Sequence, residues 1–308
     1  MGGFLGSKLI SAGNDVAFLV RAMRREQLKR EGLRVVYQAD SQDRPVKDGA
    51  GELRFEVNAV TDASEINECE ALIVAVKNFS LGEVMDAIRV LTASGACVIS
   101  FLNGVEQMEK IRAVVSDDEK IAGGVLHLEA SLDGEHVVQR GISPSVILGS
   151  PAAKRELVVQ ALADCFSCAG VVAKVSEDIL ADLWQKYIFI TILSSLTGVC
   201  MAPIGPILRN PSTNSLFEDV GAEVVDVAKK AYPNLTSVPL ERFLNQIRNL
   251  PENMTASLAR DMRRGLPTEV EYIQGYLLRR AKELGLKVPA TEFCYKILKL
   301  YEKGTPIP

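Results

Sequence analysis

The first 176 residues alternate short runs of β-branched and apolar residues with amphipathic segments of helical period. Short strands that alternate with helices are typical of a parallel sheet whose faces are covered by helices. We therefore predict an α/β domain, a Rossmann-like doubly wound parallel sheet, over residues 1–176. Strands are expected at 16–20, 33–37, 53–57, 71–76, 97–101, 120–128, 136–140, 146–149 and 171–175, and helices at 5–12, 23–31, 81–91, 107–115 and 152–169.

After Ser176 the strand patterns almost disappear and apolar residues recur with the helical period. This change predicts a second, smaller domain that is all-helical and covers residues 177–308. Its helices are expected at 178–197, 214–231, 240–248, 268–284 and 291–302.

The uncharged stretch 187–208 is long enough to raise the question of a membrane span, which needs about 20 apolar residues. Ser194 lies in its middle, and Pro203 and Pro206 interrupt helical structure before a full span is reached. We therefore expect a helix buried between neighbouring helices and no membrane partner.

Lys186 is the last charged residue before that stretch. An ammonium on the apolar face of a helix costs free energy unless it has a partner or a task. The alternative is that the side chain lies at the edge of a core helix with its ammonium in water.

The 308 residues are 47% apolar and 24% charged, as in ordinary globular proteins of about two domains. The formal charge of −4 gives no basic excess, so we do not expect a nucleic-acid partner. Six scattered cysteines and the lack of a secretory leader favour free thiols in the cytoplasm. Cys165 and Cys168 form a lone CxxC pair with no further ligands nearby, so core packing is favoured over zinc and no metal site is expected.

Glycines at the chain start resemble part of a dinucleotide-binding turn, in which backbone N–H groups approach a diphosphate at a helix N-terminus. Gly2 fits the third glycine of such a GxGxxG turn, while the preceding strand and the first two glycines are missing from the sequence. We therefore expect the natural protein to begin upstream of Met1. A flexible terminus is the alternative.

Polar residues at three expected strand ends agree with a nucleotide site, because ligands collect at the carboxyl edge of open α/β sheets. Arg21 follows the first expected strand, about 19 residues after Gly2, where a carboxylate would bind NAD. Its guanidinium could instead pair with the 2′-phosphate of NADP, although a solvated basic turn explains it equally well. Lys77 and Asn103 follow two later strands, and either could be an ordinary turn residue.

These features together resemble the ketopantoate reductase family, the 2-dehydropantoate 2-reductases, over essentially the whole chain from Gly2 onward. The segments that carry the resemblance are Phe18-Leu19-Val20-Arg21, Val76-Lys77, Leu102-Asn103-Gly104, Trp184-Gln185-Lys186, 257–261 and 268–275.

The resemblance implies an NADPH-dependent reductase of a small 2-oxo acid, with NADPH in the first domain, the substrate between the domains and a role in pantothenate biosynthesis. Lys186 matches the proton donor, because an ammonium can stabilise charge that builds on a carbonyl oxygen and then protonate it. Glu269 matches an acidic residue that contacts the cofactor near the lysine. Ser257 matches a residue that binds the substrate carboxylate, and Asn103 one shared by cofactor and substrate.

Local sequence offers a second reason for Glu269. Thr268 and Glu271 predict a capping box after Pro267, which would place Glu269 in a first helical turn, where the helix dipole favours a carboxylate.

Three positions depart from the family. Its substrate-binding asparagines should fall four and eight residues after Lys186 and in the following loop, where this chain has Ile190, Ser194 and Ile204. A hydroxyl and two aliphatic groups cannot replace three amides, so we expect a more apolar substrate than ketopantoate, with Ser194 still lining its site.

Two alternatives remain open at this point. One is a non-catalytic or impaired relative, suggested by the incomplete phosphate-binding turn. The other is a different hydroxy-acid dehydrogenase on the same scaffold. A homodimer formed through the helical domain is compatible with the sequence.

Overall fold

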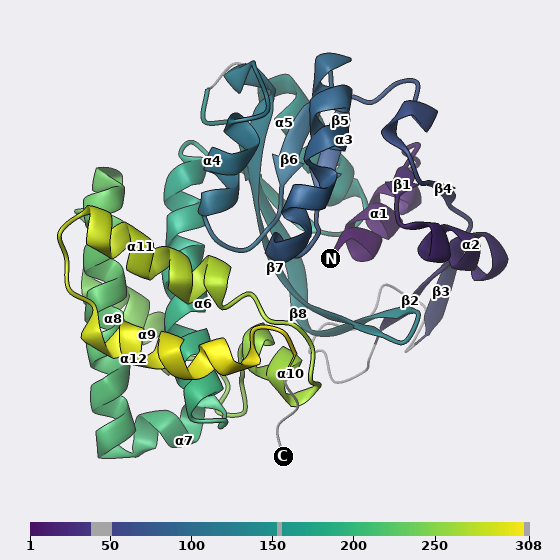
Figure 1. Cartoon of the computed structure of the whole chain (residues 1–308). Helices are drawn as coiled ribbons and strands as arrows, with labels where there is room; N and C mark the ends of the chain where they lie inside the picture. Colours follow the sequence, from purple (N-terminus) through teal and green to yellow (C-terminus); the bar gives the residue numbers. More distant parts are fainter. Residues whose placement is uncertain (38–50, 153–155, 305–308) are drawn as a thin grey trace. The chain divides into compact units, whose positions relative to one another are not determined.

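The computed structural model describes residues 1–37, 51–152 and 156–304, and the chain divides into two compact units (Figure 1). The sheet unit comprises Met1–Leu102 and Gln107–Asp182, and the helical unit comprises Asn103–Glu106 and Leu183–Pro308. The short Asn103–Glu106 segment therefore groups with the helices although its neighbours in the chain belong to the sheet unit.

The main sheet of the first unit has seven strands in the order β3-β2-β8-β7-β6-β5, with β9 paired to β8. Parallel pairs join β5 to β6, β6 to β7, β2 to β8 and β8 to β9, while β2–β3 and β7–β8 are antiparallel. A separate parallel pair joins β1 and β4. The strands are β1 Ala17–Leu19, β2 Leu33–Tyr37, β3 Glu52–Phe55, β4 Asn58–Val60, β5 Ala71–Val74, β6 Cys97–Ser100, β7 Ile121–Asp133, β8 His136–Gly149 and β9 Val172–Val175.

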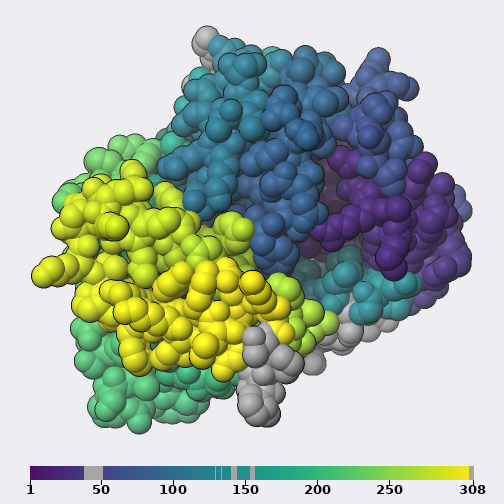
Figure 2. Space-filling view, viewed as in Figure 1, coloured from purple at the N-terminus to yellow at the C-terminus, as the bar shows by residue number. Residues whose placement is uncertain are grey.

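Helices pack on this sheet through their apolar residues. Phe4 and Leu5 of α1 and Phe166 of α5 are fully buried in one core with Ile99 of β6. In the space-filling view the purple N-terminal segment lies beside the blue segment around α3, with a recess between them (Figure 2). The helices are α1 Gly2–Ser11, α2 Ala22–Glu31, α3 Leu81–Ala93, α4 Glu106–Arg112 and α5 Glu156–Cys168, with short 3₁₀ turns at Ala63–Glu65, Asn78–Ser80 and Asp118–Lys120.

The described residues of the second unit form helices and connecting loops, with one isolated bridge between Pro267 and Lys303. Its two longest helices, α6 and α8, have 21 residues each, and α6 begins within the sheet unit. Ile188 and Ile192 of α6 and Val220 and Val224 of α8 are fully buried. The elements are α6 Ile179–Val199, α7 Ile204–Arg209, α8 Pro211–Ala231, α9 Leu240–Arg248, α10 Ser257–Arg263, a π-helical turn Glu271–Gly275, α11 Tyr276–Glu283 and α12 Pro289–Leu298, with 3₁₀ turns at Pro233–Leu235 and Lys299–Tyr301.

The predicted class, a Rossmann-like α/β sheet followed by a smaller helical domain, is confirmed. The sequence boundary at 176 falls six residues before the end of the sheet unit. Positions 153–155 of the helix predicted at 152–169 lie outside the described residues.

Several details differ from the prediction. The two strands expected at 136–140 and 146–149 are one long strand, β8, which forms an antiparallel hairpin with β7. Helices α7 and α10, of six and seven residues, were not predicted, and α7 contains Pro206, which was expected to interrupt helical structure. The strand β4 was also missed, because two of its three residues, Asn58 and Ala59, are of types depleted in strands.

Candidate active site

Lys186 is the eighth of the 21 residues of α6, and the nearby Trp184 and Tyr187 are aromatic and buried. Trp184 is 7% exposed and Tyr187 is fully buried. Their rings pack edge to face, with the ring centroids 5.4 Å apart. The Lys186 side chain is partly buried. Burial lowers the pKa of Lys186 from its ordinary 10.5 to about 8, and the Glu269 carboxylate opposes part of that decrease. Lys186 therefore lies beside buried aromatic residues, and the Glu269 carboxylate acts on its charge.

Glu269 is 4% exposed and lies just before the π-helical turn. Its carbonyl accepts the N–H groups of Tyr272 and Ile273, both at 3.0 Å, so its backbone starts the turn. The Nδ2 of Asn103 donates to the Glu269 carboxylate at 3.4 Å. Gly104 has a φ of +103°, a conformation that favours glycine and lets the chain turn directly after Asn103. Asn103, Glu269 and Lys186 are thus grouped within one compact unit.

The capping box predicted at Thr268 and Glu271 is wrong. The Thr268 N–H donates to the carbonyl of Glu302 at 3.0 Å, and the Thr268 hydroxyl is buried without a hydrogen-bond partner among the described residues. The Glu271 carboxylate instead accepts hydrogen bonds from Arg279, Tyr295 and Lys299. These donors, two of them cationic, bind the carboxylate in place of a local backbone N–H, because charge-assisted hydrogen bonds are the stronger ones.

The π-helical turn is bonded to α6 by two buried side chains. The Tyr187 hydroxyl donates to the carbonyl of Ile273 at 2.7 Å. Nε2 of Gln274 donates to the hydroxyls of Ser194 and Ser195 at 2.7 and 3.1 Å. Single π-helical turns within helices are rare and occur frequently at functional sites. Tyr187 and Gln274 were not predicted from the sequence, because their partners are about 80 residues away and no local pattern marks them.

The expected substrate residues have different environments. Ser194 is 2% exposed and takes part in the Gln274 cluster, while Ser257 is exposed at the first residue of α10. Ile190 is partly buried on α6, and Ile204 is 1% exposed at the first residue of α7.

Gly2 and Lys77, both expected to bind the cofactor, lie on neighbouring elements of the sheet unit. Gly2 is the first residue of α1, whose N-terminus has no side-chain cap. A Cβ added at Gly2 would lie 3.6 Å from Cβ of Ala75, just after β5, and Lys77 follows two residues later. The start of α1 therefore lies at the carboxyl end of β5, as a dinucleotide-binding arrangement requires.

Arg21 is exposed at the N-cap of α2, two residues after the end of β1. Its guanidinium forms an ion pair with Glu83 of α3 at 2.6 Å. Arg25, by contrast, donates to the carbonyl of Ala59 and to Glu65, both at 3.1 Å. Arg21 is therefore the more accessible of these two cations.

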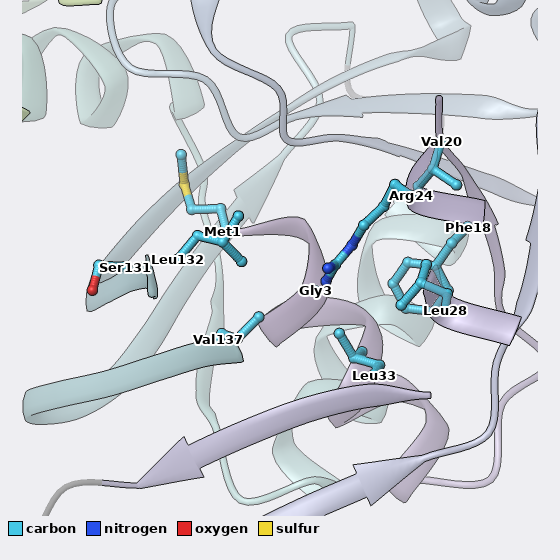
Figure 3. A pocket seen from close by; sticks show the side chains of 10 residues that line it. All are labelled: Met1, Gly3, Phe18, Val20, Arg24, Leu28, Leu33, Ser131, Leu132 and Val137. Atoms are coloured by element: carbon cyan, nitrogen blue, oxygen red, sulfur yellow. The ribbon is translucent and has the colours of Figure 1, made fainter. Parts of the chain in front are cut away.

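A cavity of about 230 Å³ lies in the sheet unit near these residues. Figure 3 shows the Arg24 side chain extending toward Gly3 at the start of α1. The other lining residues are mostly apolar: Met1, Phe18, Val20, Leu28, Leu33, Ser131, Leu132 and Val137.

Helix α6 is long and apolar enough to cross a membrane by length and composition alone, and 61% of its most apolar window is buried in the structure. A core helix passes the same test. Among residues 1–37, 51–152 and 156–304, no three His, Cys, Asp or Glu side chains are grouped so that they could hold a metal ion. Cys165 lies in α5, where its thiol contacts the Asn14 side chain at 3.2 Å.

Sequence profiles of one family cover most of the chain. The profile described as "Ketopantoate reductase PanE/ApbA" matches residues 1–152, and "Ketopantoate reductase PanE/ApbA C terminal" matches residues 178–302. The chain belongs to the ketopantoate reductase family. The resemblance predicted from the sequence motifs is thereby confirmed.

Members of the ketopantoate reductase family and their structural neighbours match along nearly the whole chain. A Bacillus subtilis protein named "Uncharacterized oxidoreductase YkpB" is 29% identical over 98% of this chain and 96% of its own. The 2-dehydropantoate 2-reductase of Pyrococcus abyssi is 25% identical over 97% and 94%. A solved D-mandelate dehydrogenase with NADH and anilino(oxo)acetate superposes with a TM-score of 0.84 at 21% identity, covering 98% of this chain and 95% of that one. The sequence relatives are named as oxidoreductases, and the superposition shows that the fold is shared.

Proposed function

We propose that this protein catalyses the NADPH-dependent reduction of a 2-oxo acid to the 2-hydroxy acid, with Lys186 as the proton donor. The observation that carries the proposal is the pairing of the partly buried Lys186 with the buried Glu269, in which burial lowers the pKa of the ammonium to about 8. A general acid works best when its pKa lies near the operating pH.

The roles of the site residues follow from their charges. A bound NADPH would supply the hydride, and negative charge then builds on the substrate oxygen. At neutral pH Lys186 is protonated, so its ammonium can stabilise that charge and transfer a proton to the oxygen. Glu269 keeps the lysine from losing its proton too early, because a carboxylate favours the charged form of a neighbouring amine. Asn103 holds the Glu269 carboxylate by a hydrogen bond.

Three groups of the sheet unit are proposed to bind the dinucleotide. The uncapped N-terminus of α1 at Gly2 and the Lys77 ammonium suit phosphate oxygens. Arg21 suits a 2′-phosphate and therefore favours NADP over NAD. Asn103 and Glu269 complete the proposed set of cofactor residues.

The substrate side chain is proposed to be more apolar than that of ketopantoate. Ile190 and Ile204 are aliphatic, and the Ser194 hydroxyl already accepts a hydrogen bond from Gln274. Ser257, at the start of α10, is proposed to bind the substrate carboxylate. The relatives named 2-dehydropantoate 2-reductase and the neighbour named D-mandelate dehydrogenase define the range to test, from a branched aliphatic to an aromatic 2-oxo acid.

The test is NADPH oxidation, followed at 340 nm, with a panel of 2-dehydropantoate, branched 2-oxo acids and phenylglyoxylate. Turnover is expected with at least one apolar 2-oxo acid. Lys186→Ala should lose about 10²–10⁴-fold in kcat, as expected for loss of a general acid, and should keep NADPH binding by fluorescence titration. Lys296→Ala, which removes an exposed ammonium on α12, is the matched control and should retain activity.

The outcomes separate the three candidate functions. Turnover by Lys186→Ala at the wild-type rate would contradict the role of Lys186. Absence of NADPH binding by the wild-type chain would favour a non-catalytic relative. Activity only with 3-hydroxy acids and NADP would favour a different dehydrogenase.

A further inference from the structure

Two buried contacts join α6 to the π-helical turn Glu271–Gly275, which follows directly after the segment that carries Glu269. We propose that Tyr187 and Gln274 are positioning residues that hold this turn against α6 and thereby fix Glu269 beside Lys186. This inference rests on the proposed function of the Lys186 and Glu269 pair, and it adds the residues that set the geometry of that pair.

Tyr187 is rigidly held. It is fully buried, and its ring packs edge to face against the rings of Trp184 and Tyr276, with centroid distances of 5.4 and 5.9 Å. Its hydroxyl donates to the carbonyl of Ile273, which also accepts the N–H of Tyr276. The phenol therefore bonds the interior of the turn, and it comes from the residue next to Lys186.

Gln274 supplies the second contact. It is fully buried, and its Nε2 reaches the hydroxyls of Ser194 and Ser195, two helical turns beyond Lys186. Its Oε1 has no hydrogen-bond partner among the described residues, so the two serines hold the amide at one end only. Losing a hydrogen bond that satisfies a buried amide is costly, which makes this contact a strong restraint on the turn.

The π-helical turn is hydrogen-bonded to the backbone of Glu269. The Glu269 carbonyl accepts the N–H groups of Tyr272 and Ile273, and Ile273 is the residue bonded by Tyr187. A shift of the turn away from α6 therefore moves the Glu269 backbone away from Lys186. Burial raises the pKa of Tyr187, and the nearby Tyr276, Arg279 of α11 and Glu106 act on it as well. Burial lowers the pKa of Lys186, and the Glu269 carboxylate opposes that decrease.

The decisive measurement is the pH titration of the Lys186 amine, followed by competitive acetylation and peptide mass spectrometry without cofactor or substrate. Tyr187→Phe keeps the ring and removes the donor. The midpoint should fall by roughly 0.5–1 pH unit, because burial persists while the carboxylate that favours the ammonium moves away. The alkaline limit of kcat should move by the same amount, with KM little changed.

Three further variants separate positioning from a general loss of stability. Glu269→Gln should lower the midpoint by itself, and adding Tyr187→Phe to it should cause no further decrease. Thr197→Val is the matched control, because Thr197 is a fully buried hydroxyl of the same helix that bonds the Ala256 N–H instead of the turn. It should destabilise the protein and leave the midpoint unchanged.

Gln274→Met provides an independent arm if Tyr187→Phe fails to fold, and it should lower the midpoint in the same direction. A folded Tyr187→Phe or Gln274→Met protein with the wild-type midpoint would overturn the inference. The titration needs no catalysis, so an inactive wild-type chain would contradict the proposed function without deciding this one.

Discussion

At the residue scale, the same side-chain type has different properties in different surroundings. Lys186 has a pKa lowered to about 8 by burial, whereas hydrogen bonds from Lys299 to Glu271 and Glu302 raise the pKa of Lys299. Burial opposes the charged form of both lysines; for Lys186 it exceeds the effect of Glu269, whereas for Lys299 the two hydrogen-bonded carboxylates outweigh it. The Lys186 ammonium is therefore the stronger acid of the two.

Arg21 allows a prediction about cofactor choice. Arg21→Ala should weaken NADPH binding about tenfold and leave NADH binding nearly unchanged, because a lost charge-assisted contact to the 2′-phosphate is worth roughly 1.4 kcal/mol. Fluorescence titration with both nucleotides measures the ratio. Arg30→Ala, on the same helix and paired with Glu31, is the control and should affect neither. Equal weakening for both nucleotides would count against a 2′-phosphate contact.

At the element scale, the Glu271 carboxylate ties the π-helical turn to two other segments. It accepts hydrogen bonds from Tyr295 of α12 at 2.8 Å, from Lys299 at 2.5 Å and from Arg279 of α11. A Cβ at Gly275 would come within 2.9 Å of this carboxylate, so glycine leaves the space that Glu271 occupies. The turn is therefore held by charge on one side and by Tyr187 and Gln274 on the other.

Glu271→Gln should lower the free energy of unfolding by about 1–3 kcal/mol at pH 7, because charge-assisted hydrogen bonds are lost. Burial raises the pKa of Glu271, but the hydrogen bonds from Lys299 and Tyr295 outweigh it and the net pKa is below the ordinary 4.5. The stabilisation is thus complete above pH 4.5 and is lost as the pH falls through the folded-state pKa. Denaturant unfolding at several pH values should show the wild-type advantage shrinking in acid. Glu292→Gln, in an exposed pair with Lys296, should change stability by less than about 0.5 kcal/mol at any pH.

At the scale of the whole molecule, each unit has its own buried core, and Asn103–Glu106 groups with the helices although β6 precedes it. Arg279 contributes to this grouping through an ion pair with Glu106 at 3.1 Å. Asn103 therefore belongs to the same compact unit as Glu269, to which it donates a hydrogen bond.

Saturating NADPH should stabilise the whole chain. A ligand at 100 times its Kd that binds the folded state alone adds about 2.7 kcal/mol to the free energy of unfolding. Scanning calorimetry should show a Tm several degrees higher, and Lys186→Ala should retain this increase because its proposed role is in catalysis. A Tm that does not respond to NADPH would contradict the cofactor assignment.

The sequence by itself determined what depends on local patterns. Strand and helix periods are properties of neighbouring residues, so the two-part architecture and most elements were predictable. The motifs around Lys186 and 268–275 indicated the family, since their residue types and spacing are set by shared chemistry.

Tertiary structure decided which distant groups meet. The Tyr187–Ile273 and Gln274–Ser194 contacts join residues about 80 positions apart, and no local period encodes them. The predicted capping box failed for the same reason, because folding brings Lys299 and Tyr295 to the Glu271 carboxylate. The pKa of Lys186 likewise depends on burial and on Glu269, which only the packed helices bring to it.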